Sequence, residues 1–387
     1  MKLLIFEWAA GTYTYPDIIE SFSRNGVEYK TVSYKFDGRK SDEFFEYRFG
    51  KVLEEKFDAV FSVNYFPLVA KCCDRAGIKY VSWSYDNPLN VMDIEETLGL
   101  ACNTVFLFDK VQVKGFRDKG FDNVYHMPLA ANCTRLDSIK LSEKDIAYYG
   151  ADVSFVGRMY ESMYNKYLEL MDDYCRGYIE AAVAAQTKIL GYYMIDEMLD
   201  DGLVKRINDH IREIDPDADL FLPREALSFA IASEITRGDR IIILNILSKR
   251  YKLNLYSWDY NELLGNVNYK GSCDYMTEMP RIFKASRVNL NINLRISQSG
   301  IPLRVLDVLG AGGFLISNFQ PEIAEFFIDG QEVVMYESVE DAIEKAMFYL
   351  GNDDIRLRIA KNGHNKVRDE FSYDIQLGKI FKTAGLT

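Results

Sequence analysis

With 387 residues, the chain is long enough for two domains, and its balance of 48% hydrophobic and 27% charged residues is typical of a globular protein. The formal net charge of −12 argues against binding nucleic acid or an anionic membrane through bulk electrostatics, although local donors can still bind an anionic ligand. No stretch of about 18 apolar residues would span a membrane, and residues 1–8 are too short for the core of a signal peptide. We therefore expect a cytoplasmic protein without a membrane span.

Short apolar strands alternate with amphipathic helices in the first third of the chain. The predicted strands cover residues 3–6, 29–32, 59–63, 80–83, 105–108 and 124–126, and the predicted helices include 16–24, 42–55 and 67–76. This alternation predicts a parallel, doubly wound sheet. The less regular segment 127–141, with Pro128 and Asn132, is predicted to be a linker.

The second part of the chain repeats this pattern around a long helical segment. A strand at 152–156 is followed by helical residues only, from Tyr160 to about Lys249, which predicts a helical insertion. The alternation then resumes, with strands at 253–257, 288–292, 314–317 and 333–336 and helices at 276–285, 339–350 and 355–371. The predicted fold class is α/β with two Rossmann-like domains, whose ligands bind at the carboxyl ends of the strands in a cleft between the two halves.

The predicted domain boundaries follow from this pattern. Residues 1–135 form an N-terminal Rossmann-like domain, and residues 136–371 form a C-terminal one with the insertion at about 160–249. Residues 372–387 are predicted to form a C-terminal helix that packs back on the N-terminal domain.

Several classes of function lack their sequence signals. The six cysteines include no Cys-x-x-Cys pair, and they lie mostly in apolar runs. They are Cys72, Cys73, Cys102, Cys133, Cys175 and Cys273. This pattern indicates reduced thiols, and no cluster of potential ligands has metal-binding spacing. The absence of a P-loop pattern and of Gly-x-Gly-x-x-Gly argues against a P-loop kinase and a dehydrogenase.

The segment 297–318, SQSGIPLRVLDVLGAGGFLISN, is the most informative part of the chain. Gly300 and Pro302 mark the start of a short helix, whose free N–H groups and positive dipole end suit a diphosphate. Arg304 and Asp307 lie three positions apart on this helix, and the carboxylate is placed to accept hydrogen bonds from ribose hydroxyls. An ordinary helix with a surface ion pair between Arg304 and Asp307 explains the same residues equally well.

Several longer motifs resemble those of a known family. They are SWSYDNPLN (82–90), DVSFVGR (152–158), LNLYSW (253–258), RVLDVLGAGGFLIS (304–317), EFFIDGQEVVMY (325–336) and IAKNGHNKV (359–367). Together they resemble the CgeB-like glycosyltransferases, of the spore maturation protein type, in the two-domain GT-B class. The resemblance implies transfer of a sugar from a nucleotide-diphosphate sugar, with a UDP-sugar favoured, to an acceptor hydroxyl. It also implies that the C-terminal domain holds the donor, without a metal or a further cofactor.

The chain departs from the pattern of related retaining enzymes at one position. Those enzymes carry two glutamates separated by seven residues, with a glycine five positions later. Asp307 stands at the second glutamate position and Gly312 keeps its spacing, but Ser299 stands at the first. The stereochemistry of transfer is therefore open. So are two alternatives, a nucleotide-sugar epimerase of the same fold and a non-catalytic binding or assembly protein on a degenerate transferase scaffold.

Three arginines are candidates for binding the donor diphosphate. Arg158 follows a strand and Gly157, and Arg304 lies near the start of the helix; Arg295, just beyond another strand, is a weaker candidate. An arginine matches phosphate oxygens with a planar fork and stabilises the charge that develops on a departing diphosphate. A solvated surface arginine is the alternative at each position.

The remaining candidates follow strands of either half. Trp258 at the end of a strand is placed to stack on a nucleobase, and packing in the core is equally compatible with its position. Gly11 allows a close approach of the backbone to a sugar or phosphate. Asp86 is a candidate general base towards an acceptor hydroxyl, with capping of its own loop as the alternative.

Overall fold

The computed structural model describes the chain apart from residues 9–12, 36–40, 90, 92–93, 218–219 and 387. Contacts divide the chain into two compact units, of which the first comprises Met1–Thr134, Gly300–Leu306 and Val367–Thr387 and the second Arg135–Ser299 and Asp307–Lys366. Each unit contains a six-stranded sheet in which the paired strands run parallel. The predicted α/β class with two Rossmann-like halves is therefore confirmed. The domain boundaries at 135 and 371 stay a prediction.

The first sheet is built from the N-terminal strands. In spatial order they are β2 (Glu28–Tyr34), β1 (Lys2–Trp8), β3 (Ala59–Val63), β4 (Lys79–Trp83), β5 (Asn103–Leu107) and β6 (Val124–His126). The helices of this unit are α1 (Tyr15–Arg24), α2 (Glu43–Leu53), α3 (Pro67–Ala76), α4 (Glu95–Leu98), α5 (Lys110–Asp118) and α18 (Tyr373–Thr383). All five residues of β3 are buried, as expected for a central strand covered by helices on both faces.

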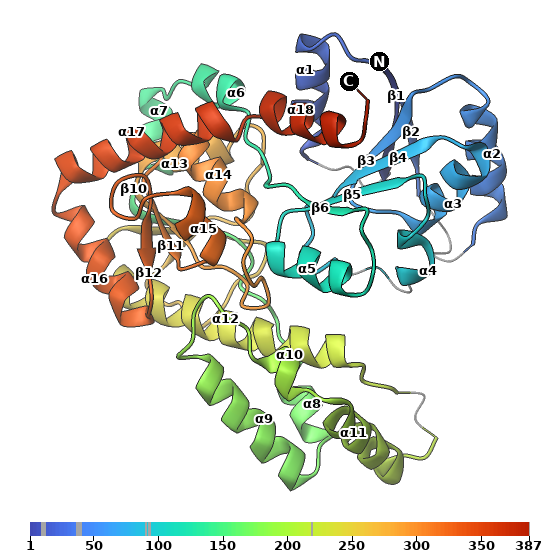
Figure 1. The fold of residues 1–387 in the computed structure, drawn as a ribbon. Helices are drawn as coiled ribbons and strands as arrows, with labels where there is room; N and C mark the ends of the chain where they lie inside the picture. The colour runs from blue at the N-terminus through green and yellow to red at the C-terminus, as the bar shows by residue number, and fades with distance from the viewer. Residues whose placement is uncertain (9–12, 36–40, 90, 92–93, 218–219, 387) are drawn as a thin grey trace. The chain divides into compact units, whose positions relative to one another are not determined.

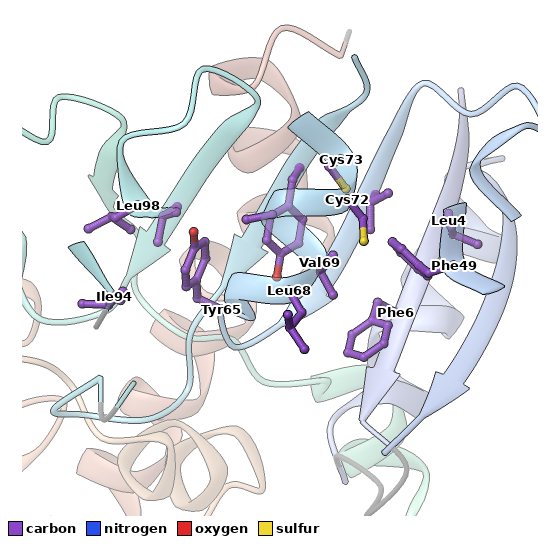
Figure 2. Close-up of a cluster of buried hydrophobic side chains, with 14 of the residues drawn as sticks. Leu4, Phe6, Phe49, Tyr65, Leu68, Val69, Cys72, Cys73, Ile94 and Leu98 are labelled. Carbon is purple, nitrogen blue, oxygen red and sulfur yellow. The ribbon is translucent and has the colours of Figure 1, made fainter. Parts of the chain in front are cut away.

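Aromatic and aliphatic side chains fill the space between this sheet and its helices (Figure 2). Phe6 of β1 meets Phe49 of α2 edge to face, with 5.9 Å between ring centroids. Val69 and Cys72 of α3 lie in the same cluster. The alternation of apolar residues in strands and helices is sufficient to explain this core.

The C-terminal helix α18 packs against α1 within the first unit. The ring of Phe381 lies 5.7 Å from that of Phe22 and 6.4 Å from that of Phe61. Asp374, in the first turn of α18, accepts hydrogen bonds from the side chains of Ser21 and Arg24 in α1. The end of the chain is thereby a structural part of this unit.

The second sheet begins after a connection that was predicted to be a linker. In spatial order its strands are β12 (Val334–Tyr336), β11 (Leu315–Asn318), β10 (Ser286–Asn291), β7 (Ala151–Val156), β8 (Leu253–Tyr256) and β9 (Asn268–Tyr269). The helices around it are α6 (Cys133–Ser138), α7 (Glu143–Tyr149), α13 (Met279–Ala285), α14 (Leu303–Gly310), α15 (Pro321–Phe326), α16 (Val339–Leu350) and α17 (Asp353–Glu370). Helix α14 contributes residues to both compact units.

Three details of this part differ from the sequence-based expectation. Residues 133–138 form α6 rather than an irregular linker. Helix α7 was not predicted, although Ser142 and Asp145 form a capping box at its start, which is a recognisable signal. Strand β9 is only two residues long, too short for a hydrophobic alternation to indicate it.

The predicted helical insertion is confirmed between β7 and β8. It consists of α8 (Tyr164–Glu169), α9 (Asp173–Gln186), α10 (Ile195–Met198), α11 (Asp201–Ile214) and α12 (Arg224–Ser248). The long helix α12 belongs to two cores: Ile243, Leu244 and Leu247 pack with the second sheet, whereas Leu227 and Ile231 pack with α9 and α11. Figure 1 shows α8, α9 and α11 on the side of α12 away from the strands. Helix α12 therefore joins the insertion to the sheet.

The packing of α18 leads to a prediction about stability. Because Phe381 is buried between α18, α1 and β3, Phe381→Ala should lower the free energy of unfolding by about 3–5 kcal/mol. Phe229→Ala on α12 is a matched control, since that ring is 47% exposed, and should change stability by no more than about 0.5 kcal/mol. Chemical denaturation followed by circular dichroism measures both values. Equal losses would contradict the structural role assigned to α18.

Candidate functional site

The carboxyl end of β7 carries the first predicted phosphate-binding residue. Gly157 extends the parallel pairing, because its N–H donates to the carbonyl of Tyr256 at 3.0 Å. The side chain of Arg158, one residue further, is exposed. Among the described residues, no hydrogen bond or ion pair involves the guanidinium of Arg158. The exposed position is therefore compatible with both interpretations of this arginine, phosphate binding and solvation.

A buried arginine holds the backbone at this position. The guanidinium of Arg240, on α12, donates to the carbonyl of Arg158 and, at the end of β10, to the carbonyl of Ile292 at 3.1 Å from Nε. The ring centroids of Phe155 and Tyr160 lie 5.0 and 4.8 Å from its central carbon. Burial lowers the pKa of this guanidinium below its usual value. The side chain of Arg240, from the insertion, thus binds the backbone beyond both β7 and β10, two neighbouring strands of the sheet.

Arg295 has a structural role in the same region. It is only 8% exposed, and its guanidinium pairs with Asp239 at 2.7 Å and donates to the carbonyl of Ile189 at 2.6 Å. Its backbone N–H donates to the hydroxyl of Thr236 at 3.0 Å. Because these partners occupy its donors, the geometry does not favour the predicted contact between Arg295 and a diphosphate.

Ser299, at the first glutamate position of the related pattern, lies beside a carboxylate. Its hydroxyl donates to Oε1 of Glu322 at 2.8 Å, and its carbonyl accepts from the N–H of Glu322 at 3.0 Å. Glu322 is 1% exposed and lies in α15. Gln320, just before that helix, donates from Nε2 to the carbonyl of Ser297 at 3.0 Å. The buried carboxylate of Glu322, from α15, therefore lies next to Ser299, which has no carboxylate of its own.

Gly300 precedes the helix that was predicted to bind the diphosphate. Its N–H donates to Oδ2 of Asp109 at 3.1 Å, so this donor is already used. A Cβ atom at Gly300 would lie 2.8 Å from the carbonyl oxygen of Phe108, which explains why a residue without a side chain is needed there. Helix α14 begins at Leu303, and Arg304 in its first turn is half-buried.

Asp307 is buried rather than a surface residue. It is 6% exposed, and its Oδ1 accepts a hydrogen bond from the hydroxyl of Tyr275 at 2.8 Å. This contact orients the carboxylate, because the Tyr275 hydroxyl binds one of its two oxygens. Binding to ribose stays a prediction for Asp307.

The exposed ring of Trp258 rules out one of its two interpretations. The side chain is 76% exposed and lies just beyond the end of β8. Packing in the core is therefore excluded, and stacking on a nucleobase stays a prediction. Gly11, the predicted site of close backbone approach, lies outside the described residues.

In the first unit, Asp86 lies in the loop after β4 and is held by a neighbouring amide. Asn64, which follows β3 with a positive φ of 64°, donates from Nδ2 to Oδ2 of Asp86 at 2.8 Å. The Oδ1 atom of Asn64 accepts from the backbone N–H of Tyr85 at 2.8 Å, so Asn64 rather than Asp86 caps this loop. Although Asp86 keeps contact with solvent, removal of water by the neighbouring protein raises the pKa of its carboxyl. A carboxylate in this setting is a stronger base than an ordinary aspartate.

Asp109 stabilises the same loop from the next strand. Its Oδ1 caps α5 by accepting from the N–H of Val111 at 2.9 Å, and its Oδ2 accepts from Nδ2 of Asn87 at 2.7 Å. Asp109 is 1% exposed. It fixes Asn87, the neighbour of Asp86, and is a structural residue that the sequence analysis did not identify.

Comparison with known proteins adds two findings. A family model described as "Glycosyl transferase-like" matches residues 233–382. Among solved structures, HepE from Anabaena in complex with UDP-glucose has a TM-score of 0.59 at 10% sequence identity, and the match covers 100% of both chains. The chain has a GT-B fold.

Two further structures agree with this fold. Sucrose-phosphate synthase from Thermosynechococcus elongatus has a TM-score of 0.56 at 10% identity, covering 99% of this chain and 98% of that one. A glycosyltransferase from Rickettsia africae has a TM-score of 0.55 at 9% identity, covering 99% of this chain and 97% of that one. Among curated proteins, no sequence matches significantly.

Two features are absent from the described residues. No group of three or more histidine, cysteine and carboxylate side chains there is arranged to hold a metal ion. In the same part of the chain, no helix is long and apolar enough to cross a membrane.

The sequence analysis did not identify Asp239, Arg240 or Glu322, and the sequence signals for these residues differ in strength. Asp239 and Arg240 interrupt a long apolar run in α12, and buried charges in such a run are a recognisable signal. Glu322 follows a proline in an unremarkable short helix, and nothing in its neighbourhood indicates burial beside Ser299. That contact depends on tertiary structure alone.

The environment of Asp86 predicts an effect of its charge on stability. Because its pKa is raised in the folded state, the folded chain binds this proton more tightly than the unfolded chain, and ionised Asp86 destabilises the fold above the folded-state pKa. Asp86→Asn should therefore leave the melting temperature at pH 7 unchanged or raise it. Below the unfolded-state pKa of about 3.9 this gain should vanish.

Asp109→Asn is the control for this experiment. Asparagine still caps α5, but its amide nitrogen would face the donors of Asn87 and Gly300, so the free energy of unfolding should fall by about 1–3 kcal/mol. Calorimetric melting of both variants at neutral and acidic pH measures the effect. A lower melting temperature for Asp86→Asn at pH 7 would show that Asp86 stabilises the loop.

Proposed function

We propose that the chain is a glycosyltransferase that moves a sugar from a nucleotide-diphosphate sugar to an acceptor hydroxyl. The observation that carries this proposal is the glycosyl transferase-like match over residues 233–382 in a chain with a GT-B fold. The matched region contains Arg240 in α12, Ile292 just beyond β10, and Asp307 in α14.

The donor is proposed to bind at the carboxyl end of the second sheet. Exposed Arg158 supplies a cation that matches phosphate oxygens, and it stabilises the charge that develops as the nucleoside diphosphate leaves. Asp307 accepts from the ribose hydroxyls, and Trp258 stacks on the base. Arg304 is proposed as a further diphosphate contact. Arginine side chains and backbone N–H groups then neutralise the diphosphate in place of a metal ion or other cofactor.

A UDP-sugar is the donor class to test first. The structure of HepE, which shares the fold, was determined with UDP-glucose, and the donor of this chain is proposed by analogy. The motifs resembling CgeB-like glycosyltransferases support assignment to that subtype as a further part of the proposal. Glu322 beside Ser299 supplies a carboxylate next to the position where this chain lacks the glutamate of the related pattern, which favours a catalytic protein over a degenerate scaffold.

Asp86 is proposed to act on the acceptor. A carboxylate whose pKa lies above its ordinary value retains a proton more readily after accepting it, which suits a general base. The amide of Asn64 orients this carboxylate by binding Oδ2. The nature of the acceptor, whether a glycan, a protein or a small molecule, is left to experiment.

The donor proposal predicts the effect of removing one cation. Arg158→Ala should weaken binding of UDP by about 1.5–3 kcal/mol, as expected for lost charge-assisted hydrogen bonds. The side chain is exposed, so the melting temperature should not change. Arg212→Ala is a control at another partly exposed arginine, on α11, and should leave UDP binding as in the wild type. Isothermal titration calorimetry showing equal affinity for UDP in wild type and Arg158→Ala would contradict the assignment of Arg158.

The acceptor proposal predicts a selective loss of turnover. Asp86→Asn should reduce sugar transfer by about 10²–10⁴-fold while the affinity for the donor stays near that of the wild type. The acidic limb of the wild-type pH–rate profile should lie above the range of an ordinary aspartate and should disappear in the variant. Transfer of labelled sugar and donor titrations measure these values. Wild-type turnover in a folded Asp86→Asn protein would remove Asp86 from the catalytic residues.

The same assays distinguish the two alternatives. An epimerase would convert or hydrolyse the nucleotide sugar without an acceptor. A non-catalytic protein would bind the donor and leave it unchanged with every acceptor offered.

A further inference from the structure

Arg240 is a buried cation whose charge interacts favourably with the nearby carboxylate of Asp239. It is 6% exposed, and its guanidinium donates to the carbonyls of Arg158 and Ile292. The carboxylate of the neighbouring Asp239 is bound to Arg295, with 2.8 Å to Nε and 2.7 Å to Nη2. Among the described residues, no ion pair between Arg240 and a carboxylate is recorded. A buried charge is unfavourable unless it is compensated, and here the nearby Asp239 carboxylate, the two carbonyls and the aromatic rings provide that compensation.

The guanidinium of Arg240 is held in one orientation. The rings of Phe155 and Tyr160 contact it, with centroids at 5.0 and 4.8 Å, and each cation–π contact restricts its plane. Phe155 lies in β7, and Tyr160 follows that strand with a positive φ of 57°. The N–H donors of the Arg240 guanidinium therefore point at the two carbonyls before any ligand binds. Such pre-organisation is what a residue that positions a binding site requires.

We propose that Arg240 is a positioning residue of the donor site, holding the peptide of Arg158 so that this exposed side chain meets the diphosphate of a nucleotide. The inference rests on the proposed function and adds a residue from the helical insertion to it. The carbonyl that Arg240 binds belongs to Arg158 itself, so the hydrogen bond fixes the backbone from which the phosphate-binding side chain extends. The second carbonyl, that of Ile292, fixes the end of the adjacent strand β10.

The neighbours of Arg240 show that the insertion as a whole supports this edge of the sheet. Thr236 and Asp239 of α12 bind the backbone and side chain of Arg295, and Ile296 packs in the core of the insertion. Gln298 donates to Asp196 of α10 at 3.4 Å. The segment from Ile292 to Gln298 is thus attached to the insertion at several points. The insertion supplies a rigid support for the carboxyl ends of β7 and β10.

The test compares a ligand with and without the diphosphate. UDP and uridine are titrated into the full chain by calorimetry, with uridine measured by displacement, for wild type, Arg240→Gln and Arg240→Lys. Loss of the positioned phosphate contact should weaken UDP binding by about tenfold or more in Arg240→Gln, while the affinity for uridine stays near that of the wild type. Arg240→Lys keeps the charge but cannot bind two carbonyls as a fork, so it should lose part of the preference for UDP.

Arg237→Gln is the matched control, because Arg237 lies one turn earlier on α12 and pairs with Glu234 at a partly exposed site. It should keep the wild-type ratio of UDP to uridine affinity. A merely structural role for Arg240 would lower the melting temperature or both affinities together without changing that ratio. An unchanged ratio in a folded Arg240 variant would overturn the inference.

Two further outcomes are distinguishable. If neither Arg240 variant folds, Tyr160→Leu removes one ring over the guanidinium, and the same fall in the ratio is expected; an unchanged ratio there would overturn the inference. If the wild-type chain binds neither UDP nor any other nucleoside diphosphate, the proposed function itself is wrong. Wild-type binding of UDP with an unchanged ratio in the variants would overturn only the role of Arg240.

Discussion

The carbonyl groups at the ends of parallel strands must find donors beyond the sheet, and in the second sheet a single guanidinium supplies them for two adjacent strands. Arg240 binds the carbonyls that follow β7 and β10, two adjacent strands. The side chain comes from α12, whose two halves pack in different cores. Because Arg240 lies between these cores, the position of the insertion and the conformation of the strand ends depend on each other. The helical insertion between β7 and β8 therefore contributes to the proposed donor site at the ends of β7 and β10.

Much of the fold could be predicted from the sequence, for a physical reason. Strands covered on both faces are continuous apolar runs, so the fully buried strand β3 was located correctly from its hydrophobicity. Helices α3 and α16 were predicted at their observed bounds because Pro67 and Ser338 mark their starts. The missed elements are those with little hydrophobic pattern.

The candidate site was harder to predict because its contacts join residues distant in sequence. Motifs indicated Arg158 and Asp307 as single residues, but no local pattern shows that Arg240 binds the carbonyl of Arg158 or that Glu322 lies beside Ser299. Residue type alone did not indicate that Arg295 pairs with Asp239 and donates to a backbone carbonyl. Buried polar residues must be paired, yet the sequence does not name their partners.

The central claim is that a nucleoside diphosphate binds where β7 ends, and a crystal structure of the chain with UDP tests it most directly. The account predicts that the diphosphate contacts Arg158, with the fork of Arg240 still bound to the carbonyls of Arg158 and Ile292. Electron density for UDP at a place remote from the carboxyl ends of β7 and β10 would contradict the account.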